Sequence, residues 1–224
     1  MKQTTWSPTP ATTTAASAAS VKNAANAKDG TLQHLATAGL YTLVTVIMLG
    51  LVYPLLMTGI ALVLFPSQAN GSLTYVNGKP VGSAIIGQLW TKPQYFQGRP
   101  SAAGKNGYDP TQTGGTNLAP TSKKLIDSVA AAVVALKKAN PDATGDIPPE
   151  LVTSSASGVD PDISPEGAYY QIPRIAKARG ASQDAIRAIV DAHVQGRTFG
   201  ILGDPHVNVL ELNRALDAAP AAKS

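Results

Sequence analysis

The sequence predicts an α+β protein in which a single N-terminal transmembrane helix precedes an exported, mixed α/β domain. Three observations lead to this prediction: a long apolar stretch near the N-terminus, a β-hairpin signal after it, and helical periodicity with capping residues towards the C-terminus. The 224 residues are 44% hydrophobic but only 14% charged. An ordinary soluble domain has about 25% charged residues, so we expect the deficit to be concentrated in one apolar segment.

The first segment, residues 1–30, is rich in threonine, serine and alanine and has no large apolar residues at a helical or strand period. Such a segment cannot bury enough surface to offset the entropy lost on ordering it. An amphipathic targeting presequence is disfavoured because the segment has no arginine and no apolar face. We therefore expect a disordered tail.

Residues 35–65 contain no charged residue, and the stretch 40–64 is apolar on every side. A transmembrane helix needs about 20 such residues to cross roughly 30 Å of hydrocarbon. The alternative, a cleaved signal peptide, has an apolar core of about 7–15 residues and a small-residue cleavage site, which is not found after Phe65. We predict a retained span, in which Pro54 removes a backbone hydrogen bond and kinks the helix unless neighbouring helices compensate.

Small residues and the proline share one face of this span. At about 100° per residue they fall within roughly 120° of one another: Gly39, Thr42, Gly50 and Pro54. Helix association in lipid depends on close packing, so this face is a candidate contact for a partner helix. The alternative is that glycine is simply frequent in membrane helices.

Charges on either side of the span predict its orientation. Lys22 and Lys28 precede it with only Asp29 against them, whereas the first positive charge after it is Lys79. The positive-inside bias places the tail in the cytoplasm and the residues that follow the span outside.

The remaining segment, residues 67–224, is long enough to form a core of its own. It opens with a hairpin, because apolar runs at 73–76 and 81–86 flank an Asn-Gly pair suited to a tight turn. Residues 93–120 are dense in glycine, proline, asparagine and threonine, which predicts an ordered but irregular loop. A helix follows, with apolar residues at helical spacing: Leu125, Val129, Val133 and Leu136.

The C-terminal part is predicted to be helical. Ser164 has the position of an N-cap for a segment that runs to Gly180, and we expect Pro173 to make its second half irregular. Ser182 caps a second helix, and Asn208 caps a last short one.

Catalytic chemistry is poorly represented. The chain has no cysteine, which excludes disulfides and thiolate sites, and its histidines are His34, His193 and His206. None lies in a nucleophile-elbow context, so we predict no catalytic residue. Asp160 and Asp162 could bind a cation, but an Asp-Pro-Asp segment more often shapes a turn, so we predict no metal site.

Two glycine-rich pieces, 113–117 and 154–158, could offer amides to phosphate, but neither has the context of a P-loop, and we interpret both as loops.

Basic residues alternate with aromatic ones between 90 and 105, which a solvated loop explains as well as a nucleic-acid platform does. The net charge of +4 is scattered along the chain, so we expect no nucleic acid partner.

Six motifs in order resemble one family, the C subunit (KdpC) of the bacterial Kdp potassium-transporting ATPase. They span residues 82–88, 95–102, 115–120, 151–165, 171–174 and 207–213. The departures are modest: Gln97 stands where the family often has histidine, Ala156 where it often has glycine, and Asp162 where histidine or asparagine is common.

The resemblance implies an accessory subunit, noncatalytic on its own, needed for assembly and coupling of a potassium import complex. In that complex a channel-like A subunit carries the ion, a P-type B subunit hydrolyses ATP, and a small F peptide assists. It also implies a single-pass protein of the bacterial inner membrane, with a cytoplasmic N-terminus and an extracytoplasmic domain. A membrane-anchored binding or scaffold protein outside potassium transport is the alternative.

The family is also described as a catalytic chaperone that raises the ATP affinity of the B subunit. Carried onto this chain, the residues linked to ATP would be Ser155, Ser157, Gly158 and Gln171. Any ATP would be shared with the B subunit and not firmly bound. The predicted topology conflicts with direct contact, because an exported domain cannot reach cytoplasmic nucleotide.

Overall fold

The computed structural model describes residues 14–219, with side chains described from Gly30 onwards. The chain divides into two compact units, residues 1–66 and residues 67–224. Each unit is described by itself below.

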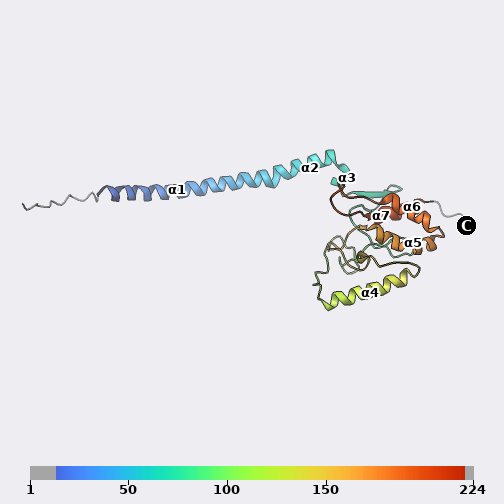
Figure 1. Cartoon of the computed structure of the whole chain (residues 1–224). Coiled ribbons are helices and arrows are strands. Elements are labelled where there is room, and N and C mark those ends of the chain that lie inside the picture. Colours follow the sequence, from blue (N-terminus) through green and yellow to red (C-terminus); the bar gives the residue numbers. More distant parts are fainter. Residues whose placement is uncertain (1–13, 220–224) are drawn as a thin grey trace, which may run out of the picture. The chain divides into compact units, whose positions relative to one another are not determined.

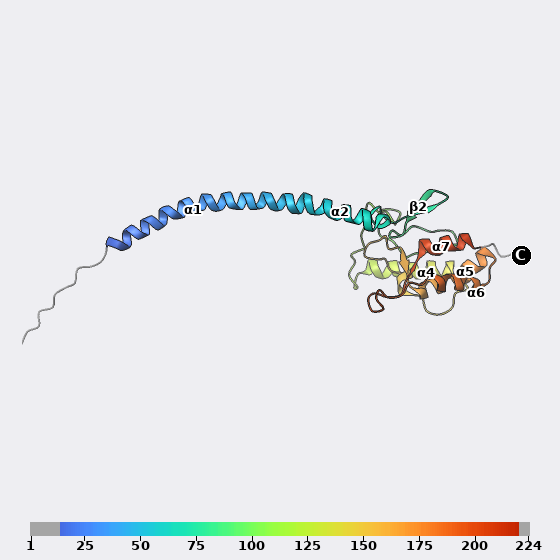
Figure 2. The same ribbon diagram turned by 90° about the horizontal axis from the view of Figure 1, so that it is seen from above.

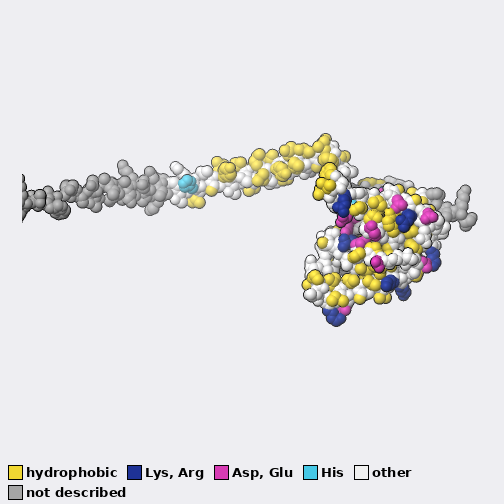
Figure 3. All heavy atoms as spheres, viewed as in Figure 1, with side chains coloured by type: hydrophobic (Ala, Val, Ile, Leu, Met, Phe, Trp, Pro, Cys, Tyr) yellow, Lys and Arg dark blue, Asp and Glu magenta, His cyan; other side chains and the backbone are white. Residues whose placement is uncertain are grey.

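The first unit is one long helical rod (Figure 1). It consists of α1 (Thr14–Ile47), a π-helical turn η1 (Met48–Val52) and α2 (Tyr53–Leu64). Within the described residues, one helical stretch is long and apolar enough to cross a membrane, the 35 residues Gly30–Leu64. Its apolar side chains are exposed in the isolated chain, as the yellow spheres of Figure 3 show. The predicted apolar helix is therefore confirmed.

The π-helical turn lies directly before Pro54. The Tyr53 N–H donates to the carbonyl oxygen of Met48, five residues earlier. A proline ring clashes with the carbonyl group four residues before it, and a wide turn relieves that clash without ending the helix. The turn also inserts about one extra residue, which brings Pro54 to within roughly 40° of Gly39 around the helix axis. The predicted packing face becomes narrower as a result.

Helix α1 begins at Thr14, so residues 14–30 are helical in the structure where we expected a disordered tail. The expectation considered only how little apolar surface this segment can bury. It neglected the many alanines, which have the highest intrinsic helix propensity, and the apolar helix that the segment continues. Residues 1–13 of the predicted tail lie outside the described residues.

The second unit opens with the short α3 (Pro66–Ala69) and an antiparallel hairpin of β1 (Leu73–Val76) and β2 (Lys79–Ser83). Asn77 and Gly78 at its turn both have positive φ, at 51° and 75°. The predicted hairpin is confirmed, although β2 begins and ends earlier than expected. Residues 93–120 contain no helix or strand in the described structure, as predicted for an irregular loop.

Helix α4 (Lys123–Ala139) matches the predicted periodicity, and the four apolar residues named in that prediction all lie on its half-buried face. The segment that follows contains η2 (Pro149–Leu151) and β3 (Asp162–Ile163), which pairs antiparallel with β4 (Val207–Asn208). This second pair of strands was not predicted, because two residues are too few for an alternating pattern to be recognised.

Three helices complete the domain: α5 (Pro165–Arg179), α6 (Gln183–His193) and α7 (Val209–Ala218). All three predicted caps are confirmed, with Ser164 and Ser182 Oγ and Asn208 Oδ1 each accepting from the backbone N–H three residues later. The expectation for Pro173 was wrong, because α5 continues through it. Buried Ile172 and Ile175 on either side anchor both halves of the helix, which offsets the roughly 3 kcal/mol cost of an internal proline.

The core lies where α5, α6 and α7 meet the β3–β4 pair (Figure 2). Its least exposed apolar side chains come from these elements and from one residue of the irregular loop: Phe96, Ile175, Val190, Val207, Leu212 and Leu216. The hairpin is tied to α7, because Thr74 Oγ1 donates to Glu211 Oε1 at 3.2 Å and Asn208 Nδ2 donates to Ala84 O at 2.9 Å.

Candidate functional site

An irregular strip of backbone, residues 93–97, lies against helices α5 and α7. Every one of its five carbonyl oxygens accepts a hydrogen bond from a side chain on these helices. Arg174 Nη1 donates to Pro93 O at 2.5 Å and Tyr95 O at 3.0 Å, Arg179 Nε to Gln94 O at 2.9 Å, Asn213 Nδ2 to Phe96 O at 3.0 Å, and Gln171 Nε2 to Gln97 O at 3.0 Å. Side chains of the two helices thus provide the donors that a neighbouring strand would provide in a sheet.

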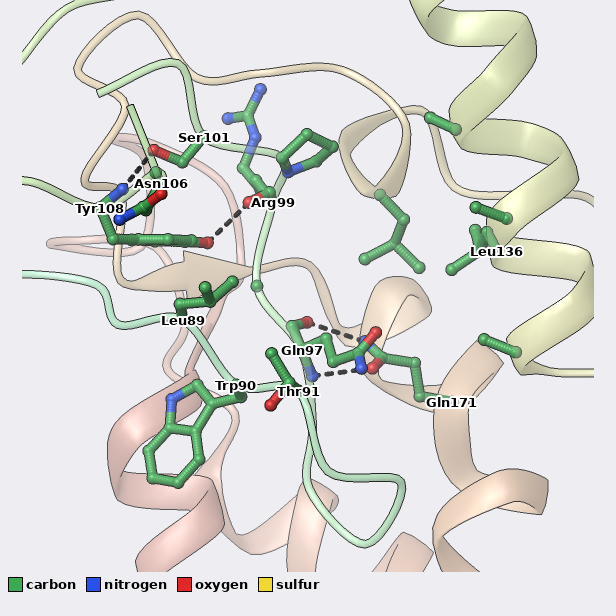
Figure 4. Close-up of a pocket in the computed structure, with 17 residues that line it drawn as sticks. Leu89, Trp90, Thr91, Gln97, Arg99, Ser101, Asn106, Tyr108, Leu136 and Gln171 are labelled. Atoms are coloured by element: carbon green, nitrogen blue, oxygen red, sulfur yellow. Dashed lines mark hydrogen bonds between the residues drawn. The ribbon is translucent and has the colours of Figure 1, made fainter. Parts of the chain in front are cut away.

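Two amides hold this strip from both sides of its backbone. Asn213 Oδ1 accepts from the N–H of Phe96, and Gln171 Oε1 accepts from the N–H of Gln97, both at 2.8 Å. Each amide therefore binds both the N–H and the C=O of one residue, as a paired strand would (Figure 4 shows the pair at Gln97). We call Gln171 and Asn213 the amide clamp.

Gln171 has no hydrogen-bonding capacity left for a ligand. Its Nε2 also donates to Gly167 O at 3.1 Å, and its Oε1 also accepts from Arg174 Nη2 at 2.8 Å. A primary amide has two N–H groups and two lone pairs, and all four are used here. With 1% of its surface exposed, Gln171 is a structural anchor in this arrangement.

Arg174 is a buried cation held by neutral oxygen atoms. Its Nε donates to Asn140 Oδ1 at 2.8 Å, and its other bonds go to backbone carbonyls and to Gln171. Desolvation by burial lowers its pKa to about 10, which still leaves it protonated at neutral pH. The guanidinium group therefore joins the end of α4, the middle of α5 and the strip 93–97.

The serine-glycine loop, residues 154–158, is shaped by its own hydroxyl groups. Ser155 Oγ accepts from the N–H of Gly158 at 2.9 Å, and Ser157 Oγ accepts from the N–H of Val159 at 3.2 Å. Ser155 is buried, whereas Ser157 is exposed. Both hydroxyls therefore act within the loop, as the loop interpretation of this glycine-rich piece predicts.

Gly158 sits where this loop meets the irregular loop. Its φ is +70°, and an added Cβ would lie 2.6 Å from Gly114 O and 2.8 Å from the Cβ of Ala103. Ser101 Oγ donates to Gly158 O at 2.5 Å, and Gly114 N donates to Ser157 O at 2.8 Å. The two glycine-rich pieces predicted as loops are thus packed against each other.

A pocket of about 490 Å³ opens beside the amide clamp (Figure 4). Its apolar wall comes from α4 and Leu151, and its polar wall from the irregular loop. The polar wall is held by Tyr108, whose hydroxyl donates to Arg99 O at 2.6 Å and whose N–H donates to Ser101 Oγ at 2.7 Å. Burial, with a smaller contribution from the charge of Asp160, raises the pKa of Tyr108 to about 12. Of the four residues linked to ATP, Gln171 alone lines this pocket.

The other candidate residues have structural partners. Asp160 pairs with Arg99 at 3.1 Å, and its Oδ1 accepts from the N–H of Asp162, the first residue of β3. His193 and His206 each place Nδ1 against a backbone carbonyl, of Ile189 and Asp204 respectively.

The aromatic residues of the basic stretch pack inwards. Phe96 is fully buried, and the rings of Trp90 and Tyr95 lie 4.9 Å apart, with the Arg179 guanidinium 5.2 Å from the Tyr95 centroid. This arrangement favours the interpretation as a loop over a nucleic-acid platform.

A family model described as KdpC, K+-transporting ATPase, c chain, matches residues 35–218. The chain belongs to the KdpC family. Its similar relatives are each named potassium-transporting ATPase KdpC subunit. The protein of Koribacter versatilis is 52% identical over 186 residues, which cover 83% of this chain and 94% of the relative. That of Myxococcus xanthus is 54% identical over 175 residues (78% and 82%), and that of Acidobacterium capsulatum 52% over 190 residues (83% and 98%). The chain is accordingly an accessory subunit in potassium import.

Three of the motifs quoted for the KdpC resemblance form hydrogen bonds with one another in the structure. The motif at 95–102 supplies residues 95–97 of the strip and Ser101, that at 171–174 supplies Gln171 and Arg174, and that at 207–213 supplies Asn213. Sequence reasoning did not identify Arg174, Arg179 or Asn213 as anchors. Arg174 and Asn213 lie in two of the quoted motifs and Arg179 lies outside them, but a motif does not name the partners of its residues.

The amide clamp predicts a large stability cost for Gln171→Ala. This change leaves the backbone groups of Gln97 and one N–H of Arg174 buried without partners, so we expect the free energy of unfolding to fall by about 3 kcal/mol. Urea unfolding of the detergent-solubilised chain, followed by Trp90 fluorescence, measures it. The matched control is Gln112→Ala at an exposed position, expected to change stability by less than about 0.5 kcal/mol. Equal stability of the two variants would contradict the clamp.

The contact between the two loops predicts that Gly158→Ala destabilises the domain by about 2–3 kcal/mol, through the positive φ and the close approach of Gly114 O. Gly114→Ala is the control from the opposing loop, since an added Cβ there meets nothing within 4 Å. Thermal unfolding of both variants gives the comparison. A Gly158→Ala protein as stable as Gly114→Ala would show that the loops separate readily.

Proposed function

We propose that the chain is a noncatalytic subunit of the Kdp pump that joins the channel-like A subunit and the ATP-hydrolysing B subunit, with the F peptide nearby. The observation that supports this most strongly is how its family motifs are used. The polar atoms of Gln171, Arg174, Asn213 and Ser101 bind backbone groups and other side chains inside the domain. Residues employed in this way build a rigid docking body, whereas catalysis needs polar groups free to meet a substrate.

We further propose that the apolar helix crosses the inner membrane with the N-terminus in the cytoplasm and residues 67–224 outside, at the ion entrance of the A subunit. The lysines before the helix, Lys22 and Lys28, support this orientation.

The second candidate role, a direct effect on ATP binding through Ser155, Ser157, Gly158 and Gln171, has less support. Gln171 is saturated, and Gly158 meets the opposing loop at van der Waals contact. Ser157 is the one of the four with an exposed side chain, so it is the residue on which this role is best tested.

Complementation tests the accessory role. In a bacterium that lacks its own C subunit but makes the A, B and F subunits, this chain should restore growth at limiting potassium and should co-purify with the A and B subunits. The Ser157→Ala variant should behave like the parent, with an unchanged apparent Michaelis constant for ATP. No growth and no co-purification would refute the proposal, whereas a large rise in that constant with assembly intact would favour the ATP role.

The orientation predicts that protease added to intact spheroplasts digests residues 67–224 and spares the N-terminal tail. A tag at each end of the chain, detected on blots, distinguishes the two parts. Lysed spheroplasts are the control in which both tags are lost. A domain that survives in intact spheroplasts would place it in the cytoplasm.

The packing face of the span predicts that Gly50→Leu weakens assembly. An added Cβ at Gly50 meets only Val46 of its own helix, at 4.0 Å, so the change is tolerated within the chain and reports on a partner helix. We expect lower recovery of the A and B subunits in detergent, whereas the neighbouring Leu51→Ile should leave recovery unchanged. Equal recovery would assign assembly to the exported domain alone.

A further inference from the structure

The loop between α6 and α7 presents three large apolar side chains to solvent. Phe199 is 89% exposed, Ile201 75% and Leu202 57%, although they are neighbours at one tip. Figure 2 shows this segment as a narrow loop that projects from the body of the domain. We call residues 197–204 the apolar finger.

The finger is an ordered structure. Thr198 and Leu202 exchange both backbone hydrogen bonds, at 2.9 and 3.0 Å, and Gln195 and His206 do the same at its base, at 2.8 and 3.0 Å. The Gly200 N–H also donates to the carbonyl oxygen of Arg197 at 2.9 Å. The tip is therefore held in one shape before any partner binds, which lowers the entropy cost of binding.

That shape is maintained against local preference. Phe199 has a φ of +54°, in the left-handed region that bulky residues rarely occupy, and Gly200 and Gly203 follow at +77° and +75°. Within this chain, no burial of the Phe199 ring offsets the free-energy cost of its backbone conformation. It becomes favourable when the ring is buried by something outside it.

The charges of the finger favour a protein partner over lipid. Its two charged residues, Arg197 and Asp204, form an ion pair at 2.7 Å, so the finger has no net charge. Loops and helices that bind a membrane surface through apolar side chains usually add lysine or arginine to attract anionic headgroups. A lipid surface would also accept these side chains in any conformation, whereas a protein pocket selects one.

The position of the finger indicates where that partner lies. In Figure 1 the finger lies on the same side of the domain as α3, which contains the first residues of this unit, 67–69. Those residues follow the apolar helix within five positions of Leu64. The domain that carries the finger is therefore joined to the apolar helix by only a short stretch of chain.

We propose that the apolar finger inserts Phe199 and Ile201 into an apolar pocket on a membrane-embedded subunit of the same pump. This inference rests on the proposed function, which supplies the assembly. The inference goes further than that function because it names one docking element and its chemistry. The element is a preformed apolar tip without net charge, and it binds a concave, uncharged surface of the partner.

Photo-crosslinking in native membranes tests the proposal. The photoreactive residue p-benzoylphenylalanine replaces Phe199 in the full chain, which is expressed with the other pump subunits and irradiated. The same residue at Val134 is the control, because Val134 is 68% exposed on α4. We expect position 199 to form an adduct with the mass of a pump subunit, in at least about tenfold greater yield than position 134. An adduct with phospholipid, or no adduct, would overturn the proposal.

Substitution gives a second measurement. The double change Phe199→Ser with Ile201→Ser should leave the chain in the membrane fraction but reduce recovery of its partners by about tenfold or more, whereas Val134→Ser should not. Protease resistance of the domain verifies folding. If the parent chain co-purifies with the pump and the double variant does so equally well, the finger proposal is wrong while the proposed function stands. If the parent itself does not co-purify, the proposed function fails.

Discussion

All five carbonyl oxygens of the strip 93–97 accept hydrogen bonds from side chains of two helices, in bonds that are partly or fully shielded from solvent. The rest of the domain is organised around this arrangement. Helix α5 must present Gln171, Arg174 and Arg179 on one face, and α7 must bring Asn213 beside them. Phe96 then fills the core from a segment that belongs to no helix or strand. An irregular loop thereby becomes a rigid part of the fold.

The same constraint separates what the sequence could predict from what it could not. Helices α4 to α7, their caps and the first hairpin follow from periodicity and local hydrogen bonding, both of which short stretches of sequence encode. The strip depends on pairs such as Gln97 with Gln171, 74 positions apart, and nothing in either neighbourhood specifies the other. The resemblance to KdpC identified these segments as motifs but did not say that they bind one another.

The two prolines are accommodated in different ways. Proline was expected to disturb the helix at both Pro54 and Pro173, as its missing N–H requires in isolation. In α5, burial of neighbouring side chains keeps the helix regular, while in the apolar helix a π-helical turn accommodates the ring. Local rules therefore identified where each helix is weak, and the surroundings decided how that weakness is resolved.

Recognition through the backbone has a consequence for position 97. The clamp binds the N–H and C=O of Gln97, which any residue other than proline provides, while the residue also lines the pocket beside α4. The side chain of Gln97 takes no part in these two hydrogen bonds, so they do not depend on which residue occupies the position. The wall of the pocket at this position can therefore change its chemistry without the loss of a hydrogen bond that holds the strip.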